Sequence, residues 1–416
     1  MMLPMPFLSK LHTRFREVTK MRSVDAMPVA EADAFKERCS RVNIYSHSKK
    51  QTDLMEQLLE DLWIHIVKPI LDHLLHGQAS QQNIKEESKA WQIPDQDKRQ
   101  RLWWCCQGDF SFLPLHAAGI YHGDSPICIS DFFISSYTPT LGALIDARNR
   151  PLPHELKVLA AAQPDAGSTK LMKVGEELKV IEQIVPPQNL IYLNNDRHLD
   201  LEGKHTSVET VLTKLPEASV LHLACHGTQD ANNPLRSGFL LERGKRLTIH
   251  KLVQYRYPNA FMAILSACHT ASNDAEQPEE VMNIASALMF LGFGTILGTK
   301  WPMSDLDGPI VAKFVYNALF NQQITPEALK QTSPWVMERL FGDHLMKLKT
   351  FSSESDPGYA EAFQELTKDH IAARTEGSAR TLATFSLARV VDDLAREMRR
   401  NKVPAERWAT FVHIGV

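Results

Sequence analysis

The chain has 416 residues, and its 46 Lys and Arg against 49 Asp and Glu give a net charge of −3. A chain of this length holds either two average domains or one large domain with attachments. A nearly neutral charge argues against a nucleic-acid-binding protein and against a protein that binds an anionic membrane surface.

The six cysteines are too few and too scattered for a disulfide framework in a chain this long. No segment has the roughly 18 uncharged apolar residues that a membrane-spanning helix needs. The N-terminal segment MMLPMPFLSKLHTRFREVTK has its basic residues after its apolar ones, the reverse of a signal peptide. We therefore expect a cytoplasmic protein in a reducing compartment, without nucleic-acid or membrane partners.

Apolar residues recur at helical spacing from Leu54 to Leu75, which predicts a helix. Pro69 lies inside this run and should kink the helix or start a second one. We expect the apolar face of the helix to pack on the rest of the protein. The polar residues 77–98 are typical of a linker, so we divide the chain into a helical lead-in with its linker, residues 1–98, and one α/β domain, residues 99–416.

Short apolar runs alternate with helical stretches after residue 100. Strands are expected at RLWWCC, ICISDFFISSY, LKVLAAA, NLIYL, SVLHLAC, AFMAILSAC, GTILGT and ATFVHIGV. Helices are expected near 171–185, 205–215, 278–291 and 307–320, and again from Leu387 to Met398. This alternation predicts a mostly parallel sheet flanked by helices. The irregular, charged residues at about 327–382 are interpreted as a late helical insertion.

Two of the predicted strands end in residues that suit nucleophilic catalysis. SVLHLAC is followed by His226 and Gly227, and AFMAILSAC ends at Cys268. Ligands bind beyond the carboxyl ends of the strands in an open α/β sheet, so His226 and Cys268 should face one crevice. A thiol nucleophile needs such an imidazole, which later protonates the leaving amine. The amides of Gly227 and Cys268 are candidates for an oxyanion hole.

Several sequence blocks occur in the order and spacing of a known family. HLACHGTQDANNPLRSGFLL, LSACHTA and FLGFGTILGTKWPMSD, with FLPLHAAGIY before them and RWATFVHIGV at the end, resemble the fungal-type CHAT family over roughly residues 54–416. This family belongs to the clan of caspases and separases. The resemblance implies a caspase-like α/β sandwich and a cysteine endopeptidase without metal or cofactor. It assigns His226 as the catalytic histidine, Cys268 as the nucleophile and Gly227 to the oxyanion hole. It also implies a protein or peptide substrate and, in many members, an activating sensor or regulatory partner.

Separases carry an acidic specificity residue in a Trp-x-x-x-Asp pattern, which Trp301–Asp305 resembles. Asp305 is therefore the candidate for reading a basic P1 side chain, the residue before the cleaved bond, with Asp307 and Glu280 as rivals. A structural interpretation is also open for each carboxylate. The segment around Ser304 could cap the following helix, and Glu280 could lie at the positive end of a helix dipole.

The other histidines and cysteines have simpler interpretations. His222 lies four positions before His226 on a predicted strand, so both face the same side, and we expect His222 to be a structural core residue. The neighbouring Cys225 should face the opposite side and be buried, and burial is also expected for Cys105, Cys106 and Cys128. A zinc site of these histidines with Cys268 and His269 lacks the usual closely spaced ligand pairs.

Two other classes of function were weighed against a peptidase. One is a non-catalytic CHAT signalling or scaffold module that binds peptides in the same crevice, which an electrophilic peptide probe distinguishes from an enzyme. The other is a nucleotide-binding α/β domain. The sequence lacks the GxxxxGK[ST] phosphate loop, and Gly292-Phe-Gly294 is only a weak match to a dinucleotide-binding motif.

Overall fold

The computed structural model describes residues 11, 13–15, 41–76, 93–95, 98–111, 113–123, 126–153, 155–164, 171–194, 206–228, 230, 233–266, 280–301, 303–320 and 386–416. The predicted insertion at 327–382 lies outside the described residues, as do Cys39, Cys268 and His269.

The described residues form an eight-stranded sheet with the strand order β1-β4-β13-β12-β11-β7-β5-β6. Strands β6, β5, β7, β11 and β12 run parallel, whereas β13 is antiparallel to β12, and β4 and β1 run parallel to β13. The mostly parallel sheet predicted from the sequence is thereby confirmed. Its strands are β1 (Gln100–Trp104), β4 (Phe133–Tyr137), β5 (Val158–Gln163), β6 (Leu190–Asn194), β7 (Val220–Cys225), β11 (Met262–Leu265), β12 (Thr295–Thr299) and β13 (Phe411–Gly415).

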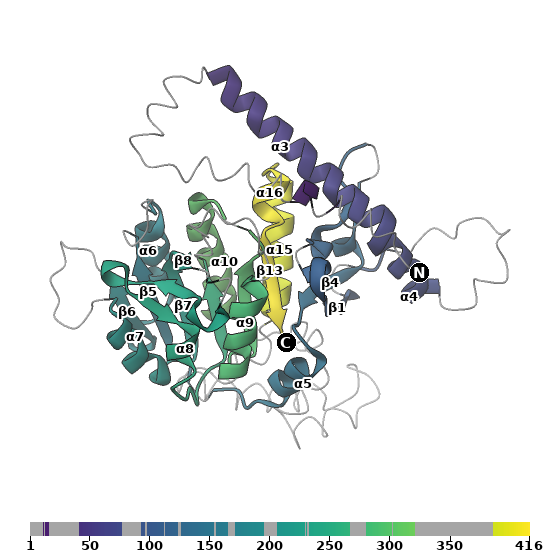
Figure 1. The fold of residues 1–416 in the computed structure, drawn as a ribbon. Coiled ribbons are helices and arrows are strands. Elements are labelled where there is room, and N and C mark those ends of the chain that lie inside the picture. Colours follow the sequence, from purple (N-terminus) through teal and green to yellow (C-terminus); the bar gives the residue numbers. More distant parts are fainter. Residues whose placement is uncertain are drawn as a thin grey trace, which may run out of the picture.

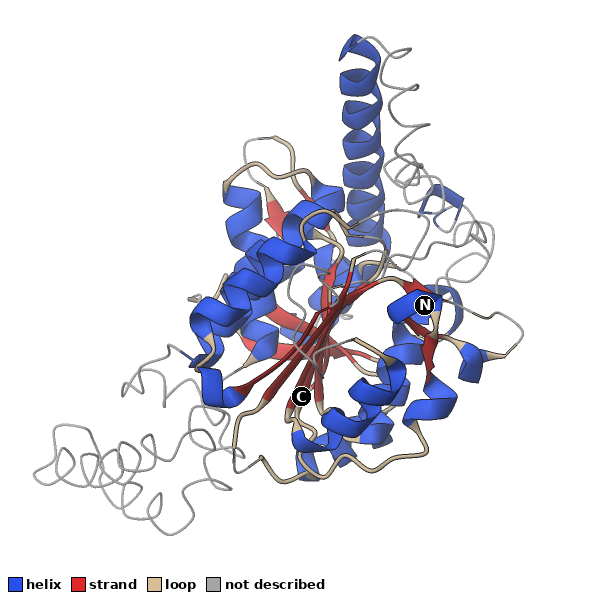
Figure 2. Ribbon diagram, turned by 90° about the vertical axis from the view of Figure 1, so that its left-hand side faces the viewer, coloured by secondary structure: helices blue, strands red, loops and turns tan. Residues whose placement is uncertain are grey.

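The central strands are buried on both faces, which explains why their sequences lack an alternation of polar and apolar residues. Every residue of β5, β7, β11 and β12 is buried. Such strands occur where helices cover both sides of a sheet, and Figure 2 shows this arrangement around the central strands. The C-terminal ends of β7 and β11 lie side by side, because these two strands are parallel neighbours in the sheet.

Two groups of helices make up the outer layers. On one face α6 (Val174–Ile184) packs against α10 (Gly308–Phe320), which in turn packs against α15 (Leu387–Arg400). The helices α9 (Glu280–Leu291), α5 (Leu141–Asn149) and α8 (Ile249–Leu252) pack together elsewhere, with α9 against β12. The helix α7 (Val208–Lys214) precedes β7. The helices expected at 171–185, 205–215, 278–291, 307–320 and 387–398 are all present, so the helical periodicity was a reliable guide for them.

Short elements that the sequence did not predict surround this core. Directly after β7, the strands β8 (Gly227–Thr228), β9 (Gly238–Leu240) and β10 (Arg246–Thr248) form a small antiparallel sheet, which fixes the chain that follows His226. A second pair consists of β2 (Gly119–Ile120) and β3 (Ile127–Cys128). The helix α16 (Ala405–Trp408) leads into β13. Strands of two or three residues are too short to show a period.

The predicted N-terminal helix is present and longer than expected. It comprises α3 (Arg41–Leu62), a π-helical turn (Trp63–Val67) and α4 (Lys68–His76), and Figure 1 shows α3 along one side of the molecule. The wide turn comes just before Pro69, which has no N–H for the regular helical bond, so the predicted irregularity is confirmed. Packing of this helix is also confirmed, because its apolar residues Met55, Leu58, Leu59 and Leu62 are buried. No helix within the described ranges is long and apolar enough to cross a membrane.

The predicted burial of the cysteines is confirmed for two of them and wrong for a third. Cys225 and Cys128 are buried, whereas Cys105 is exposed and Cys106 is half-buried. The run RLWWCC was read as one strand, but β1 ends at Trp104, so Cys105 lies past the C-terminal end of the strand.

Candidate active site

His226 comes directly after the buried strand β7 and is itself buried. Its carbonyl accepts a hydrogen bond from the N–H of Leu240 in β9 at 2.7 Å, while Gly227 lies opposite Phe239. In an antiparallel ladder this pattern makes Gly227 and Phe239 a non-hydrogen-bonded pair, so the N–H of Gly227 points away from β9. This amide is therefore not used in the ladder with β9, which is a condition that an oxyanion donor has to meet.

The ladder between β7 and β11 has the same residue offset as the two candidate catalytic positions have in the sequence. It pairs position 262 with 220 and position 265 with 223, an offset of 42 residues, and Cys268 also follows His226 by 42 residues. Ser266, just past β11, donates a hydrogen bond to the carbonyl of Leu223 at 3.3 Å. The structure thus brings together the two strand ends that the sequence singled out, while Cys268 itself lies outside the described residues.

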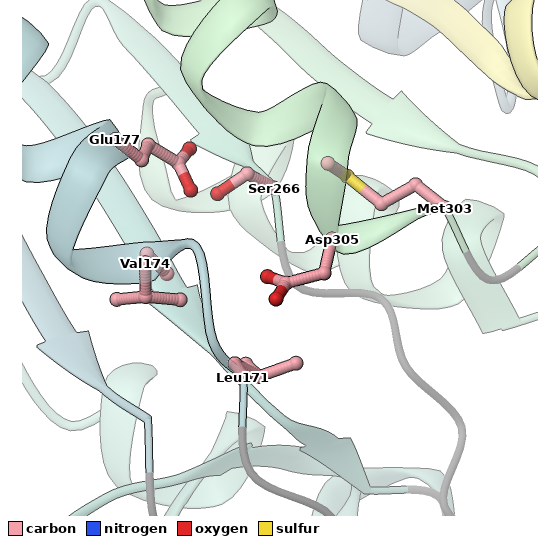
Figure 3. Close-up of a pocket in the computed structure, with 7 residues that line it drawn as sticks. Leu171, Val174, Glu177, Ser266, Met303 and Asp305 are labelled. Atoms are coloured by element: carbon pink, nitrogen blue, oxygen red, sulfur yellow. The ribbon is translucent and has the colours of Figure 1, made fainter. Parts of the chain in front are cut away.

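A pocket lies beside these strand ends, between the starts of α6 and α10. Figure 3 shows the carboxyl groups of Glu177 and Asp305 and the hydroxyl of Ser266 directed toward the same space. The two carboxylates come from different elements, α6 and the 3₁₀ turn Asp305–Asp307 that leads into α10. The described residues that line the pocket are Leu171, Val174, Glu177, Ala224, Ser266, Met303 and Asp305.

Asp305 both lines this pocket and caps a helix. Its Oδ2 accepts a hydrogen bond from the N–H of Lys173 at 2.8 Å, and Lys173 is the residue before α6. The sequence suggested that this segment caps the helix that follows it, but Asp305 instead bonds the start of α6, and Ser304 makes no side-chain capping bond to the described residues. Burial raises the pKa of Asp305 above 3.8 despite the N–H groups of Lys173 and Met172, and the nearby charge of Glu177 raises it further.

The two rival carboxylates occupy different settings. Asp307 is fully buried and forms an ion pair with Arg407 of α16, in which Nη2 bonds Oδ1 and Nε lies 3.2 Å from Oδ2. This pair joins the start of α10 to the C-terminal segment, and Asp307 is not among the described residues that line the pocket. Glu280 is the first residue of α9, and its side chain lies outside the described set.

His222 is the centre of a buried polar network, which confirms its predicted structural role. Its Nε2 lies 2.9 Å from Oε1 of Glu177, and its Nδ1 lies 3.1 Å from the hydroxyl of Tyr316. The network joins β7 to α6 and α10. Gly308, the first residue of α10, leaves room for the carboxyl group, because a Cβ at this position would lie 2.5 Å from Oε2 of Glu177.

Sequence reasoning missed Glu177, although one signal for it exists. Val174, Leu178 and Ile181 form the buried face of α6, and Glu177 lies on that same face. A carboxylate at a core-facing helical position is unusual unless it is paired or functional. The partner, His222, lies in another element 45 positions away, so the sequence pattern alone does not connect them.

Metal binding has no support from the part of the chain that the structure describes. Among those residues, no group of three or more His, Cys, Asp or Glu side chains is placed to hold a metal ion. The acidic pocket offers two carboxylates and one hydroxyl, a set that suits an organic cation through charge-assisted hydrogen bonds.

Comparison with known families gives one match, to the model described as CHAT domain, over residues 56–416. A comparison with curated proteins finds no match. The matched range begins within α3 and includes the whole eight-stranded sheet, both strand ends and the acidic pocket. The mostly parallel sheet with its flanking helices is that of a caspase-like α/β sandwich.

Proposed function

Because the chain belongs to the CHAT domain family, a caspase-like and peptidase-related family, we propose that it is a cysteine endopeptidase that cleaves after basic residues. The observation that carries the proposal is the position of His226. It ends β7 next to the end of β11, the strand that leads toward Cys268, and the same strand ends border a pocket lined by Asp305.

In the proposed reaction the thiolate of Cys268 attacks the carbonyl carbon of the cleaved peptide bond. The negative charge on the carbonyl oxygen is stabilised by the amides of Gly227 and Cys268, and His226 gives its proton to the leaving amine as the C–N bond breaks. Water, deprotonated by the same imidazole, then hydrolyses the acyl-enzyme. The shared offset of 42 residues and the direction of the Gly227 N–H both support this assignment.

Asp305 is the proposed reader of the basic P1 side chain. Its carboxyl group lines the pocket, and a bound cation would stabilise the ionised form that burial disfavours. Asp307 is the weaker candidate because both of its oxygens are engaged by Arg407. Glu280 is supported as a specificity residue only by its place in the sequence.

Labelling with an electrophilic peptide probe tests the proposal. A peptidyl acyloxymethyl ketone with arginine at P1 should form a covalent adduct on Cys268, located by peptide mass spectrometry. The exposed Cys105 is an internal control for unselective alkylation. Reversible binding without an adduct would instead favour the scaffold module, and an adduct at Cys105 alone would contradict the assignment of Cys268.

A further inference from the structure

We propose that Glu177 is a second specificity-determining residue, and that with Asp305 it makes the pocket select arginine over lysine. This inference rests on the proposed function only in taking the pocket as the place of the P1 side chain. The family pattern gave Asp305 alone; Glu177 comes from the pocket geometry.

Apolar side chains accompany the two acidic side chains in the lining of the pocket. Leu171, Val174, Ala224 and Met303 provide apolar surface for a methylene chain, and the described lining contains no Lys or Arg to neutralise its acids. Glu177 is only 3% exposed, whereas Asp305 is partly exposed, so one carboxylate lies deep and the other nearer to solvent.

Glu177 is held in place before any ligand binds. His222 contacts Oε1, Tyr316 contacts the other ring nitrogen of His222, and Gly308 leaves space beside Oε2. A carboxylate that is fixed in this way does not have to be ordered when a cation arrives, and this preorganisation favours binding.

The chemistry of two separated carboxylates distinguishes the two basic side chains. A guanidinium is planar, carries five N–H donors and is weakly hydrated, so its donors suit the two carboxyl groups of Glu177 and Asp305 that face the same space. An ammonium is a compact, strongly hydrated charge that loses more on entering a largely buried pocket. The second carboxylate therefore contributes more to the binding of arginine than to the binding of lysine.

Peptide binding to the full-length Cys268→Ala protein tests this without relying on cleavage. Calorimetric titrations would compare acetyl-Ala-Ala-Arg-amide with its lysine analogue and with citrulline, which has the shape of arginine without its charge. We expect arginine to bind about tenfold or more tighter than lysine, the equivalent of one charged hydrogen bond, and citrulline to bind weakly.

Glu177→Gln in the same background isolates the charge, because glutamine keeps the shape and can still bond His222. It should weaken arginine binding about tenfold and lysine binding much less, so that the preference falls toward one. Glu182→Gln, on the exposed side of α6, is the matched control and should change neither affinity. A purely structural Glu177 would leave the ratio of the two affinities unchanged in Glu177→Gln.

The titrations of the Cys268→Ala protein, whose pocket is unaltered, still decide the question if Glu177→Gln does not fold. Lysine binding as tightly as arginine to the Cys268→Ala protein would overturn the inference, as would equal losses for both ligands in Glu177→Gln. Arginine selectivity together with an absence of peptide cleavage by the wild type would instead overturn the proposed peptidase function and leave the pocket assignment standing.

Discussion

Oε1 of Glu177 lies 2.9 Å from Nε2 of His222, and both side chains are buried, while Glu177 also lines the acidic pocket. The hydroxyl of Tyr316 contacts the other ring nitrogen at 3.1 Å. In a medium of low dielectric constant such a network stabilises the fold only while every member has a partner. The position of Glu177 in the pocket therefore depends on contacts among three elements, β7, α6 and α10.

Breaking this network should destabilise the protein unequally. His222→Ala leaves a carboxyl group buried without its partner, and we expect it to lower the free energy of unfolding by about 3 kcal/mol. Tyr316→Phe removes one neutral hydrogen bond and should cost about 1 kcal/mol. Urea unfolding measures both. Tyr257→Phe, which loses a buried bond to the carbonyl of Leu252, is the control for Tyr316→Phe. Equal costs for His222→Ala and Tyr316→Phe would contradict the contact between His222 and Glu177 as the main bond of the network.

Asp305 and Asp307 provide a matched pair of substitutions two positions apart. Asp305→Asn should abolish the preference for basic P1 residues while the protein stays folded, since asparagine still accepts the N–H of Lys173. Asp307→Asn should preserve the preference but lower the free energy of unfolding by about 2 kcal/mol, because Arg407 loses its buried partner. A library of fluorogenic peptides and urea unfolding measure the two effects. The reverse pattern would transfer the specificity role to Asp307.

Stability should also depend on pH through Asp305, whose pKa is raised by burial above 3.8. Between 3.8 and the raised pKa the folded protein binds more protons at this site than the unfolded chain, so its contribution to stability is lost as pH rises through that window. Asp305→Asn cannot ionise and should gain stability relative to wild type over the same window. Measuring the free energy of unfolding of both proteins across that pH range tests this sign. A wild type that becomes more stable relative to the variant as pH rises would refute it.

The space at Gly308 can be tested by adding one methyl group. Gly308→Ala would place a Cβ 2.5 Å from Oε2 of Glu177, so the carboxyl group must move from His222. We expect a loss of about 1–3 kcal/mol in the free energy of unfolding, together with a weaker preference for arginine. Gly175→Ala in α6 meets nothing within 4 Å and should be neutral or stabilising by up to about 1 kcal/mol. A neutral Gly308→Ala would show that Glu177 is not held where we place it.

The sequence predicted the elements of this fold where a pattern of residues is compatible with only one kind of structure. The run before His226 is almost wholly apolar and does not alternate, because β7 is covered on both faces. The sequence does not predict the direction of a strand, because a strand has the same burial pattern whichever way it runs. Nothing in ATFVHIGV indicates that β13 runs antiparallel to β12.

The candidate site was predicted only where its residues lie at strand ends or in a family pattern. His226 and Asp305 were found in this way, whereas Glu177 depends on a contact between α6 and β7 that no local pattern encodes. For Asp305 the sequence posed capping and substrate recognition as alternatives, but the side chain caps α6 and lines the pocket at once. Cys105 shows the opposite error. It was expected to be buried in a strand because the apolar run includes it, but the strand ends one residue earlier and Cys105 is exposed.

Peptide cleavage by wild type, Cys268→Ala and Cys225→Ala tests the central claim most directly. All three proteins would first be shown to be folded, since Cys225 is buried in β7 and its truncation should cost about 1 kcal/mol. With an arginine-P1 fluorogenic peptide, the account predicts hydrolysis by wild type and Cys225→Ala and none by Cys268→Ala. Cleavage that persists in folded Cys268→Ala, or that is lost equally in both variants, would contradict Cys268 as the nucleophile.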